Sequence, residues 1–285
     1  MTGDDGYNAL EETALRTRYR TSFAANDRTG YYISAAAVAL LAFGLWHLGF
    51  SITKFLHGLA NLGNFVVLMF PPSWGDTSSL MRLLKALGET VAIALLGTML
   101  AAAIALPLSF LAANNTTISQ ILRFFARRSF DTLRGVDTLV WALIWVNVVG
   151  LGPFAGVLAI AISDIGSFGK LFSEAIEASD KKPVEGVIAS GGSRLHAIRF
   201  GILPQVAPVL ISQFLYYFES NTRSATIIGI VGAGGIGLQL SEQIRTLEWQ
   251  TVCFIIIMIL ITVSVIDLIS TKLRVAISGK ARTTI

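Results

Sequence analysis

Long stretches without charged residues alternate with short polar segments along this chain, and several of these stretches are long enough to span a membrane. The first, Tyr31–Phe50, contains no Asp, Glu, Lys or Arg and can cross a bilayer as one helix. A cleaved signal peptide is the alternative interpretation. We favour a retained helix because the leader is long, the apolar core exceeds that of a typical signal peptide, and no clear cleavage site follows. Residues 1–30 are then a polar N-terminal tail.

The next segment is too interrupted by polar residues to predict a span. Its apolar residues recur at helical spacing, which favours an amphipathic helix on the outer membrane surface: Ile52, Phe55, Leu56, Leu59, Leu62 and Val66. The proline-containing sequence Phe70–Trp74 ends this helix, and Trp74 suits an interfacial depth. We therefore treat residues 31–82 as one region with the first transmembrane helix and an outer amphipathic segment.

Residues 83–274 are predicted to form the core domain. Glu89 marks the start of the second span, because no charged residue follows until Arg123. We expect one helix here, kinked near Pro107 and ending at Asn114. A basic loop is expected next, with four arginines: Arg123, Arg127, Arg128 and Arg134.

Four further spans complete the prediction. The sequence Gly-Leu-Gly-Pro at 150–153 breaks the next charge-free run, which favours a tight outer turn between two helices. We place these helices at about Asp131–Val149 and Pro153–Ala178. The fifth span runs from Pro204 towards Ile230, and the sixth from Trp249 to about Ile269. The pattern therefore predicts an all-α integral membrane protein with about six transmembrane helices.

A glycine-rich sequence, Gly232 to Gly237, lies between the fifth and sixth spans and matches G-x-G-x-x-G letter for letter. A dinucleotide-binding loop needs a strand before it and a helix after it, whereas membrane spans flank this one. We therefore reject a nucleotide site and predict a turn at the outer surface or a close approach of two backbones.

Composition supports membrane insertion. Of the 285 residues, 53% are hydrophobic and only 14% are charged, whereas a soluble domain carries about a quarter charged residues. The net charge of +4 does not indicate nucleic-acid binding, because the basic residues cluster beside apolar spans rather than among aromatic residues. The single cysteine, Cys253, excludes a disulfide framework within one chain.

The distribution of basic residues predicts the orientation. With six spans, sixteen of the 22 Lys and Arg residues fall on one side, in the N-terminal tail, residues 114–134, residues 181–204 and the chain after residue 270. The positive-inside rule places that side in the cytoplasm. Both termini, including a C-terminal tail at 275–285, and the 181–204 segment are therefore expected to be cytoplasmic.

No catalytic or nucleotide-binding motif accompanies these helices. The chain lacks the phosphate-binding sequence G-x-x-x-x-G-K-[ST], and no nucleophile–base pairing stands out. Its three histidines, His47, His57 and His196, lack metal-ligand spacing. We therefore expect no catalysis, no metal and no cofactor in this chain itself.

We single out five ionisable residues within or near the predicted spans, where a charge is costly and often functional. Three of them, Asp137, Asp164 and Asp267, are interpreted as lying near helix ends at the membrane interface. Glu219 and Arg223 differ, because they are four residues apart on one helix face and well inside a span. A purely structural ion pair is the simplest interpretation of these two residues.

The polar segment KKPVEGVIASGGSRLHAIRFGILP, at 181–204, predicts two short helices joined by a turn. Gly191 can close the first helix in a left-handed conformation, and Ser193 can cap the second. Gly201 and Pro204 are expected to end the second helix and open the fifth span. The simplest interpretation of this segment is a solvated helical hairpin.

The spacing of Glu185, Gly191 and Leu203-Pro204 also resembles the EAA loop of ABC-importer permeases. In that family the loop is a cytoplasmic helix that docks into a cleft on the ATPase subunit. The sequence departs from the family pattern at three positions: Gly186, Val187 and Gly201. The resemblance implies that Glu185, Gly191, Leu203 and Pro204 couple this chain to an ATPase.

Longer segments resemble the permease subunit of phosphonate-type ABC importers (PhnE-like proteins). They are residues 141–180, 185–204, 218–237 (FESNTRSATIIGIVGAGGIG) and 266–274 (IDLISTKLR). The resemblance implies a type I ABC-importer permease fold in a bacterial inner membrane and a homodimer. It also implies two cytoplasmic ATPase subunits that use ATP and Mg²⁺, and a substrate-binding protein outside. That family carries phosphonates, phosphate and phosphite along an alternating-access pathway at the dimer interface.

This substrate class gives the Glu219–Arg223 pair a second interpretation, as part of the pathway. The planar guanidinium of Arg223 matches the oxygens of a tetrahedral anion, and Glu219 would prevent it from holding the anion too tightly. Asn221 and Ser224 could add neutral hydrogen bonds if the helix unwinds there.

Two other classes of function compete with a permease. A proton-coupled secondary transporter of a small anion could use Asp137, Asp164 and Glu219 as relay groups and would need no ATPase. An integral-membrane enzyme would be active alone, and the missing catalytic constellation counts against it.

Overall fold

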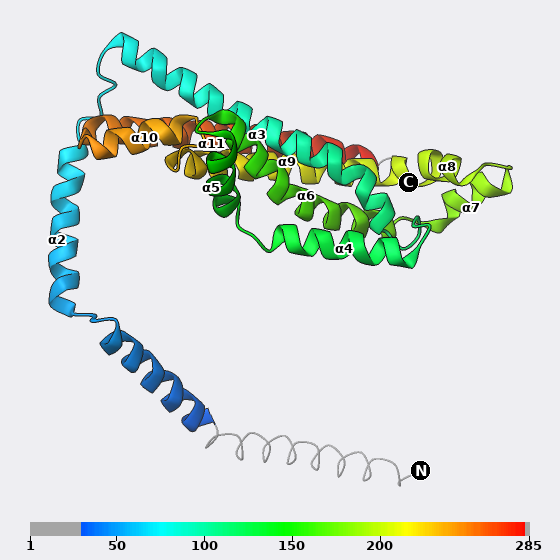
Figure 1. The fold of residues 1–285 in the computed structure, drawn as a ribbon, viewed down its shortest axis with the longest axis horizontal. Coiled ribbons are helices and arrows are strands. Elements are labelled where there is room, and N and C mark those ends of the chain that lie inside the picture. Colours follow the sequence, from blue (N-terminus) through cyan, green and yellow to red (C-terminus); the bar gives the residue numbers. More distant parts are fainter. Residues whose placement is uncertain (1–29, 283–285) are drawn as a thin grey trace, which may run out of the picture. The chain divides into compact units, whose positions relative to one another are not determined.

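The computed structural model describes residues 30–282 of the chain. Contacts divide the chain into two units, residues 1–67 and residues 68–285. All regular secondary structure in the described residues is helical (Figure 1). The predicted tail at residues 1–30 lies outside the described residues, except for Gly30, where the first helix begins.

The first unit contains the helix Gly30–His47 and most of α2, Ile52–Met69. The first of these confirms a helix over the predicted span at Tyr31–Phe50. α2 is an unbroken helix of 18 residues and is long and apolar enough to cross a membrane. The prediction that this segment is too interrupted to span was therefore wrong, because its polar residues do not break the helix and only Lys54 is charged.

The second unit begins with α3, Thr77–Ala112, a helix of 36 residues. It starts well before Glu89, the predicted first residue, because Asp76 caps it by accepting a hydrogen bond from the Thr77 amide at 2.6 Å. Hydrogen bonds from Ser78 and Thr77 lower the pKa of Asp76, so the cap is ionised at neutral pH. Pro107 lies inside the helix, which ends close to the predicted exit at Asn114.

Two helices replace the predicted basic loop and third span. They are α4, Gln120–Arg134, and α5, Thr138–Val149, which meet at 88°. The placement of a third helix at Asp131–Val149 was therefore wrong. The arginines predicted to form a loop lie on an amphipathic helix, and the Asp137 side chain starts a new helix by accepting a hydrogen bond from the Leu139 amide at 2.8 Å.

The fourth span agrees with α6, Pro153–Glu177. Beyond it lie α7, Lys181–Ala189, and α8, Arg194–His196, as the sequence predicted. Gly191 has φ +87°, which confirms the left-handed turn, and Ser193 caps α8.

Gly201 does not end the second of these short helices. A π-helical segment, η1 (Ala197–Ile202), continues from α8 into α9, Leu203–Ile230, so the predicted break was wrong. The glycine serves packing, because a Cβ atom at this position would lie 3.0 Å from the Cα of Val184 in α7. Pro204 lies in the first turn of α9, where no backbone N–H donor is needed.

The glycine-rich sequence after α9 forms a tight turn before α10, Ile236–Arg245. Gly232, Gly234 and Gly235 all have positive φ. A Cβ atom on Gly229 of α9 would lie 2.9 Å from the Cα of Gly237, so the backbones approach as closely as predicted. No strand precedes this turn in the described residues, in agreement with the rejection of a dinucleotide site.

The final helix, α11, extends over Trp249–Arg282. The helix therefore continues past Ile269, the predicted end of the sixth span, while the cytoplasmic location of a tail at 275–285 stays a prediction. Charged residues do not break a helix, and neither Gly nor Pro occurs between Ile269 and Gly279. Among residues 30–282, six helices are long and apolar enough to cross a membrane, with a seventh if α4 and α5 form one bent span.

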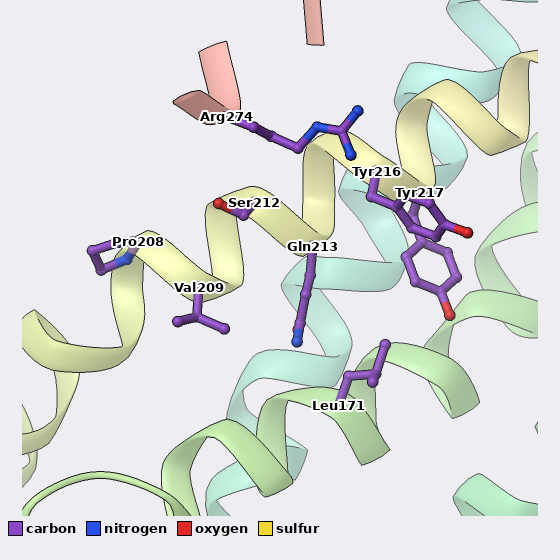
Figure 2. Close-up of a pocket in the computed structure, with 8 residues that line it drawn as sticks. All are labelled: Leu171, Pro208, Val209, Ser212, Gln213, Tyr216, Tyr217 and Arg274. Atoms are coloured by element: carbon purple, nitrogen blue, oxygen red, sulfur yellow. The ribbon is translucent and has the colours of Figure 1, made fainter. Parts of the chain in front are cut away.

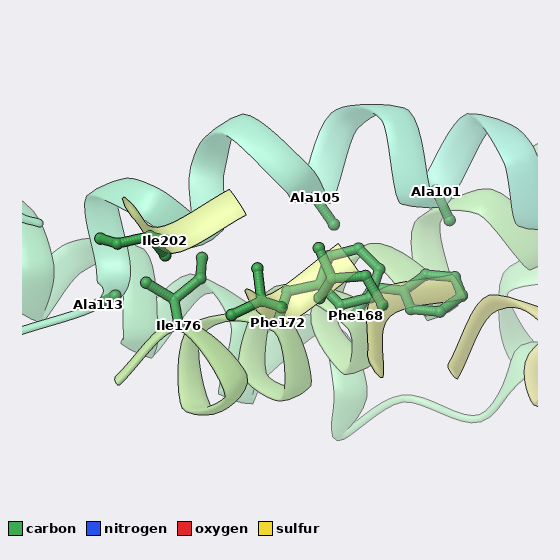
Figure 3. Packing of buried hydrophobic residues seen from close by; sticks show 9 residues of the cluster. Ala101, Ala105, Ala113, Phe168, Phe172, Ile176 and Ile202 are labelled. Carbon is green, nitrogen blue, oxygen red and sulfur yellow. The ribbon is translucent and has the colours of Figure 1, made fainter. Parts of the chain in front are cut away.

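Alanines on α3 allow the aromatic side chains of α6 to pack closely (Figure 3). Ala101 and Ala105 are fully buried and belong to one cluster with Phe168 and Phe172, whose ring centroids lie 4.9 Å apart. In a membrane such close packing of small and large residues replaces the exclusion of water as the main attraction between helices. Ile202 of η1 extends the cluster to the start of α9.

Candidate functional site

The Glu219 carboxylate, on α9, binds two arginines. Its Oε1 accepts a hydrogen bond from Arg223 Nη1 at 3.1 Å, and its Oε2 accepts one from Arg274 Nη2 at 3.1 Å. The predicted pair of Glu219 and Arg223 is therefore confirmed as an ion pair, and Arg274 on α11 is a third member. Both carboxylate oxygens are used, so the acid ties α9 to α11. We refer to these three residues as the Glu219 cluster.

Arg274 was not among the predicted site residues, and was counted only with the basic residues after position 270 that are expected on the cytoplasmic side. The unbroken α11 helix carries it alongside α9, where its Nε donates to the Ser270 carbonyl at 3.4 Å and its guanidinium lies 6.0 Å from the ring centroid of Tyr216. The sequence contained a clue to this position, because no Gly or Pro lies between Ile269 and Arg274 to end the helix.

The Glu219 cluster carries one more positive than negative charge. The side chain of Glu219 is 10% exposed, that of Arg274 29% and that of Arg223 50%. Asp267, the nearest acid on α11, makes no salt bridge with a described residue and lies in mid-helix, so its predicted position near a helix end was wrong. An uncompensated cation inside a membrane protein is costly, and an anion that enters the site would reduce that cost.

Asn221 belongs to a different set of contacts. Its amide nitrogen donates to Thr98 Oγ1 of α3 at 2.8 Å and to the Asp164 carboxylate of α6, and all three side chains are buried. α9 does not unwind here, so the prediction that Asn221 lines the pathway with Arg223 is not supported in this conformation. Ser224 is half-buried, and its hydroxyl makes no hydrogen bond with a described residue.

Both Asp164 and Asp137 were predicted to lie near helix ends, and only Asp137 does. Asp164 lies in the middle of α6 with 5% of its surface exposed, so its predicted place near a helix end was wrong. The predicted helix, Pro153–Ala178, already placed Asp164 away from both ends, so its position in mid-helix followed from the predicted bounds. Asp137, by contrast, caps α5 at a helix end, as predicted.

A cavity of about 650 Å³ adjoins Arg274 (Figure 2). Its walls come from α6, α9 and α11, and Figure 2 shows Arg274 reaching from α11 towards the side chains of α9. The lining residues are Leu171, Pro208, Val209, Ser212, Gln213, Tyr216, Tyr217 and Arg274. The Oε1 atom of Gln213 is buried and accepts no hydrogen bond from a described residue. The cavity therefore combines space, a cation and an unused polar atom next to the Glu219 cluster.

The predicted coupling segment lies at one end of the long helices of the second unit (Figure 1). Asp180 caps α7, and Gln205 fixes α7 to the start of α9: it accepts from the Asp180 amide at 3.0 Å and donates to the Gly201 carbonyl at 2.6 Å. Glu185 is exposed on α7, and Leu203 and Pro204 are exposed at the start of α9.

Three apolar residues of this segment were missed by the sequence analysis. Ile188 is 53% exposed, Leu195 76% and Phe200 59%. Large exposed apolar side chains in a polar segment between long helices are typical of a protein-binding surface. The signal was available for two of them, because Leu195 follows Arg194 and Phe200 follows Arg199 in a polar segment.

Comparison with known proteins identifies the family. The family model of the binding-protein-dependent transport system inner membrane component matches residues 105–282. This chain belongs to that family. HtxC of Stutzerimonas stutzeri, a permease protein assigned to a phosphite transport system, is 41% identical over 96% of this chain and 95% of its own. PtxC of the same organism, a phosphite transport system permease protein, is 36% identical over 83% of this chain and 85% of its own.

Other relatives have related names. PhnE of Mycolicibacterium smegmatis, a phosphate-import permease protein, is 34% identical over 80% of this chain and 42% of its own length. Among solved structures, an inward-facing MetNI methionine ABC transporter matches with a TM-score of 0.60 and 16% identity, over 71% of this chain and 99% of that one. A second crystal form of the same transporter gives a TM-score of 0.62 at 17% identity.

These findings confirm the predicted fold and class of function. The protein is a multi-pass membrane protein with the type I ABC-importer permease fold, and its family forms the transmembrane part of transport systems. The proton-coupled transporter considered above is not favoured, because none of these relatives belongs to that class.

Proposed function

We propose that this chain is the permease of an ATP-driven importer for phosphonate-, phosphate- or phosphite-type oxyanions. The names of its relatives supply the substrate class, because HtxC, PtxC and PhnE are described as phosphite or phosphate permeases. The observation that carries the proposal within this chain is the Glu219 cluster, in which two guanidinium groups face one buried carboxylate. The excess positive charge is suited to an anion in transit.

The pathway passes Arg223, whose side chain is the most exposed of the cluster. Its guanidinium offers a planar set of donors to a tetrahedral oxyanion, and the Glu219 carboxylate competes for the same donors. This competition keeps binding weak, as a transit site requires. Ser224, the residue after Arg223 on α9, is half-buried and could add a hydroxyl group from the neighbouring side of the helix, while Asn221 holds α9 against α3 and α6.

The partners follow from the same proposal. A second copy of the chain completes the pathway as a homodimer, an ATPase dimer binds in the cytoplasm, and a substrate-binding protein delivers the anion from outside. ATP and Mg²⁺ bind to the ATPase, and this chain contributes no catalytic residue. Glu185, Gly191, Leu203 and Pro204 form the coupling surface, and the exposed apolar residues of the same segment contribute to it.

The basic residues orient the permease with both termini and the 181–204 segment in the cytoplasm. The coupling surface then meets the ATPase on the side where ATP is available.

Reconstitution tests this function. Vesicles that contain the permease and its ATPase, with the binding protein outside and ATP inside, are expected to take up radiolabelled phosphate, phosphite or methylphosphonate. Uptake should stop when ATP is omitted and should persist when a protonophore removes the proton gradient. Uptake that depends on the proton gradient and not on ATP would instead establish the secondary transporter.

A further inference from the structure

A second group of basic residues lies on α4, apart from the Glu219 cluster, and borders two adjoining cavities. The larger cavity, about 320 Å³, is lined by Gln120, Arg123, Phe124, Arg127 and Arg128, with no acidic residue among them. The smaller, about 190 Å³, is lined by Arg127, Arg128, Phe130, Asp131, Lys170 and Ser173. Arg127 and Arg128 line both cavities, so the two form one continuous basic surface, which we call the α4 basic site.

Positive charge exceeds negative charge by two at the α4 basic site. Its four cations are Arg123, Arg127, Arg128 and Lys170, and its two acids are Glu177 and Asp131. Glu177 binds Arg127 closely, at 2.8 Å. Asp131 is 3.5 Å from Arg128 and 3.8 Å from Lys170, longer than the roughly 2.7–2.9 Å of a strong charge-assisted hydrogen bond. The acids therefore neutralise this surface only in part.

Several donors of the α4 basic site have no partner in the described part of the chain. The Nε atom of Arg123 is buried and makes no hydrogen bond there. The Arg128 guanidinium makes only the long 3.5 Å ion pair with Asp131, and it lies 5.7 Å from the ring centroid of Phe124, which holds it at the rim of the larger cavity. A buried donor without a partner, such as Arg123 Nε, is costly, and the exposed Arg128 guanidinium is only weakly paired, so both groups favour an anionic ligand.

An exposed apolar stripe runs along α4 beside the α4 basic site. Ile121 and Phe125 lie one turn apart on the same side of α4 and are 70% and 63% exposed, and Ile118, just before the helix begins, is 82% exposed. A free inorganic anion would leave this stripe uncovered. A molecule with a phosphate group and hydrocarbon chains would cover both surfaces at once.

We propose that the α4 basic site binds the head group of an acidic phospholipid, with the acyl chains lying along the stripe of Ile118, Ile121 and Phe125. The position suits a membrane surface, because Arg127 binds the last residue of α6, Glu177, just before the polar 181–204 segment. The site has two joined cavities and two positive charges in excess. It therefore matches a cardiolipin-type lipid, which has two phosphodiester groups, better than a lipid that has one phosphodiester group.

Native mass spectrometry of the purified full-length protein, with defined lipids added, tests this site. Cardiolipin is expected to bind more tightly than phosphatidylglycerol, and phosphatidylcholine is expected to bind weakly. Arg128→Gln should weaken cardiolipin binding about fivefold, and Arg128→Gln with Lys170→Gln about 25-fold, since each basic residue near acidic lipid contributes about one such factor. Arg134→Gln is the matched control, because Arg134 is an exposed arginine of the same helix that lines neither cavity.

Three results would overturn the proposal. Equal effects of Arg128→Gln and Arg134→Gln would show only diffuse attraction of lipid to a basic protein. Displacement of cardiolipin by millimolar inorganic phosphate would identify a site for soluble anions. Efficient cross-linking of a cysteine at position 121 to its counterpart in a second copy, unchanged by cardiolipin, would show that protein covers the stripe. None of these measurements depends on transport, so they are independent of the proposed function.

Discussion

Replacing Arg274 with glutamine tests whether the cation from α11 stabilises the packing of α11 against α9. The substitution removes one charge-assisted hydrogen bond from Glu219, and such a bond contributes about 1.5–3 kcal/mol. The carboxylate keeps its bond to Arg223 at 3.1 Å, so no buried charge is left unpaired. Because the Arg274 side chain is 29% exposed, solvent screening lowers the expected cost to about 1–2 kcal/mol.

Glu219→Gln should be more harmful than Arg274→Gln. It leaves two guanidinium groups without their anion, and the cost of about 3–5 kcal/mol for breaking a fully buried pair is an upper bound here, because Arg223 is 50% and Arg274 29% exposed. The double variant, Glu219→Gln with Arg274→Gln, should then be less destabilised than the sum of the single variants, because the second substitution removes a cation that has already lost its partner.

Thermal unfolding of the purified protein in one detergent, followed by helical circular dichroism, measures these effects. Arg274→Gln is expected to lower the apparent Tm by about 2–8 °C, at about 2–4 °C for each kcal/mol. Lys272→Gln is the control, since Lys272 is an exposed cation of the same helix without a salt bridge to a described residue. Equal shifts for Arg274→Gln and Lys272→Gln, or strictly additive effects in the double variant, would refute the reasoning.

Three other predictions concern coupling, packing and orientation. Gly191→Val should abolish ATP-driven uptake while the protein still inserts, because φ is +87° at this turn; normal uptake by this variant would remove the turn from the coupling surface. Asn221→Leu should destabilise the protein by about 1–3 kcal/mol, because it leaves the buried Asp164 carboxylate without its hydrogen-bond donor. Thermal unfolding measures this effect, and an unchanged Tm would show that the hydrogen bond from Asn221 does not stabilise the fold. In a Cys253→Ala background, an impermeant thiol reagent applied to intact cells should label a cysteine at position 243 and not one at 182, and the reverse result would overturn the orientation.

The sequence predicted the long elements of the fold well. Length and charge-free runs were sufficient for α6 and α9, and the turn residues Gly191 and Ser193 were placed correctly because their conformations are set locally. Helix ends were harder to predict. The pattern of charges suggested that α3 starts at Glu89 and α11 ends near Ile269, but a charge on a helix face does not interrupt the backbone hydrogen bonds.

The candidate site depended on contacts between distant parts of the chain. The pair of Glu219 and Arg223 was predictable, because residues four apart meet on one helix. Arg274 lies 55 positions from Glu219 in sequence, and only the packing of α11 on α9 brings it to the carboxylate. Asn221 was assigned to the pathway from its proximity in sequence, and the helix turns its side chain towards α3 and α6 instead.

The most direct test of the oxyanion pathway is transport by the variant Glu219→Gln with Arg223→Gln, measured together with ATP hydrolysis in the same reconstituted vesicles. The substitutions remove one acid and one base, so the net charge of the Glu219 cluster does not change. We expect a complex that assembles and hydrolyses ATP but takes up little labelled phosphate, phosphite or methylphosphonate, and Arg223→Lys should be partly active. Near-normal uptake by the double variant would show that the pair is only structural and would remove Arg223 from the pathway.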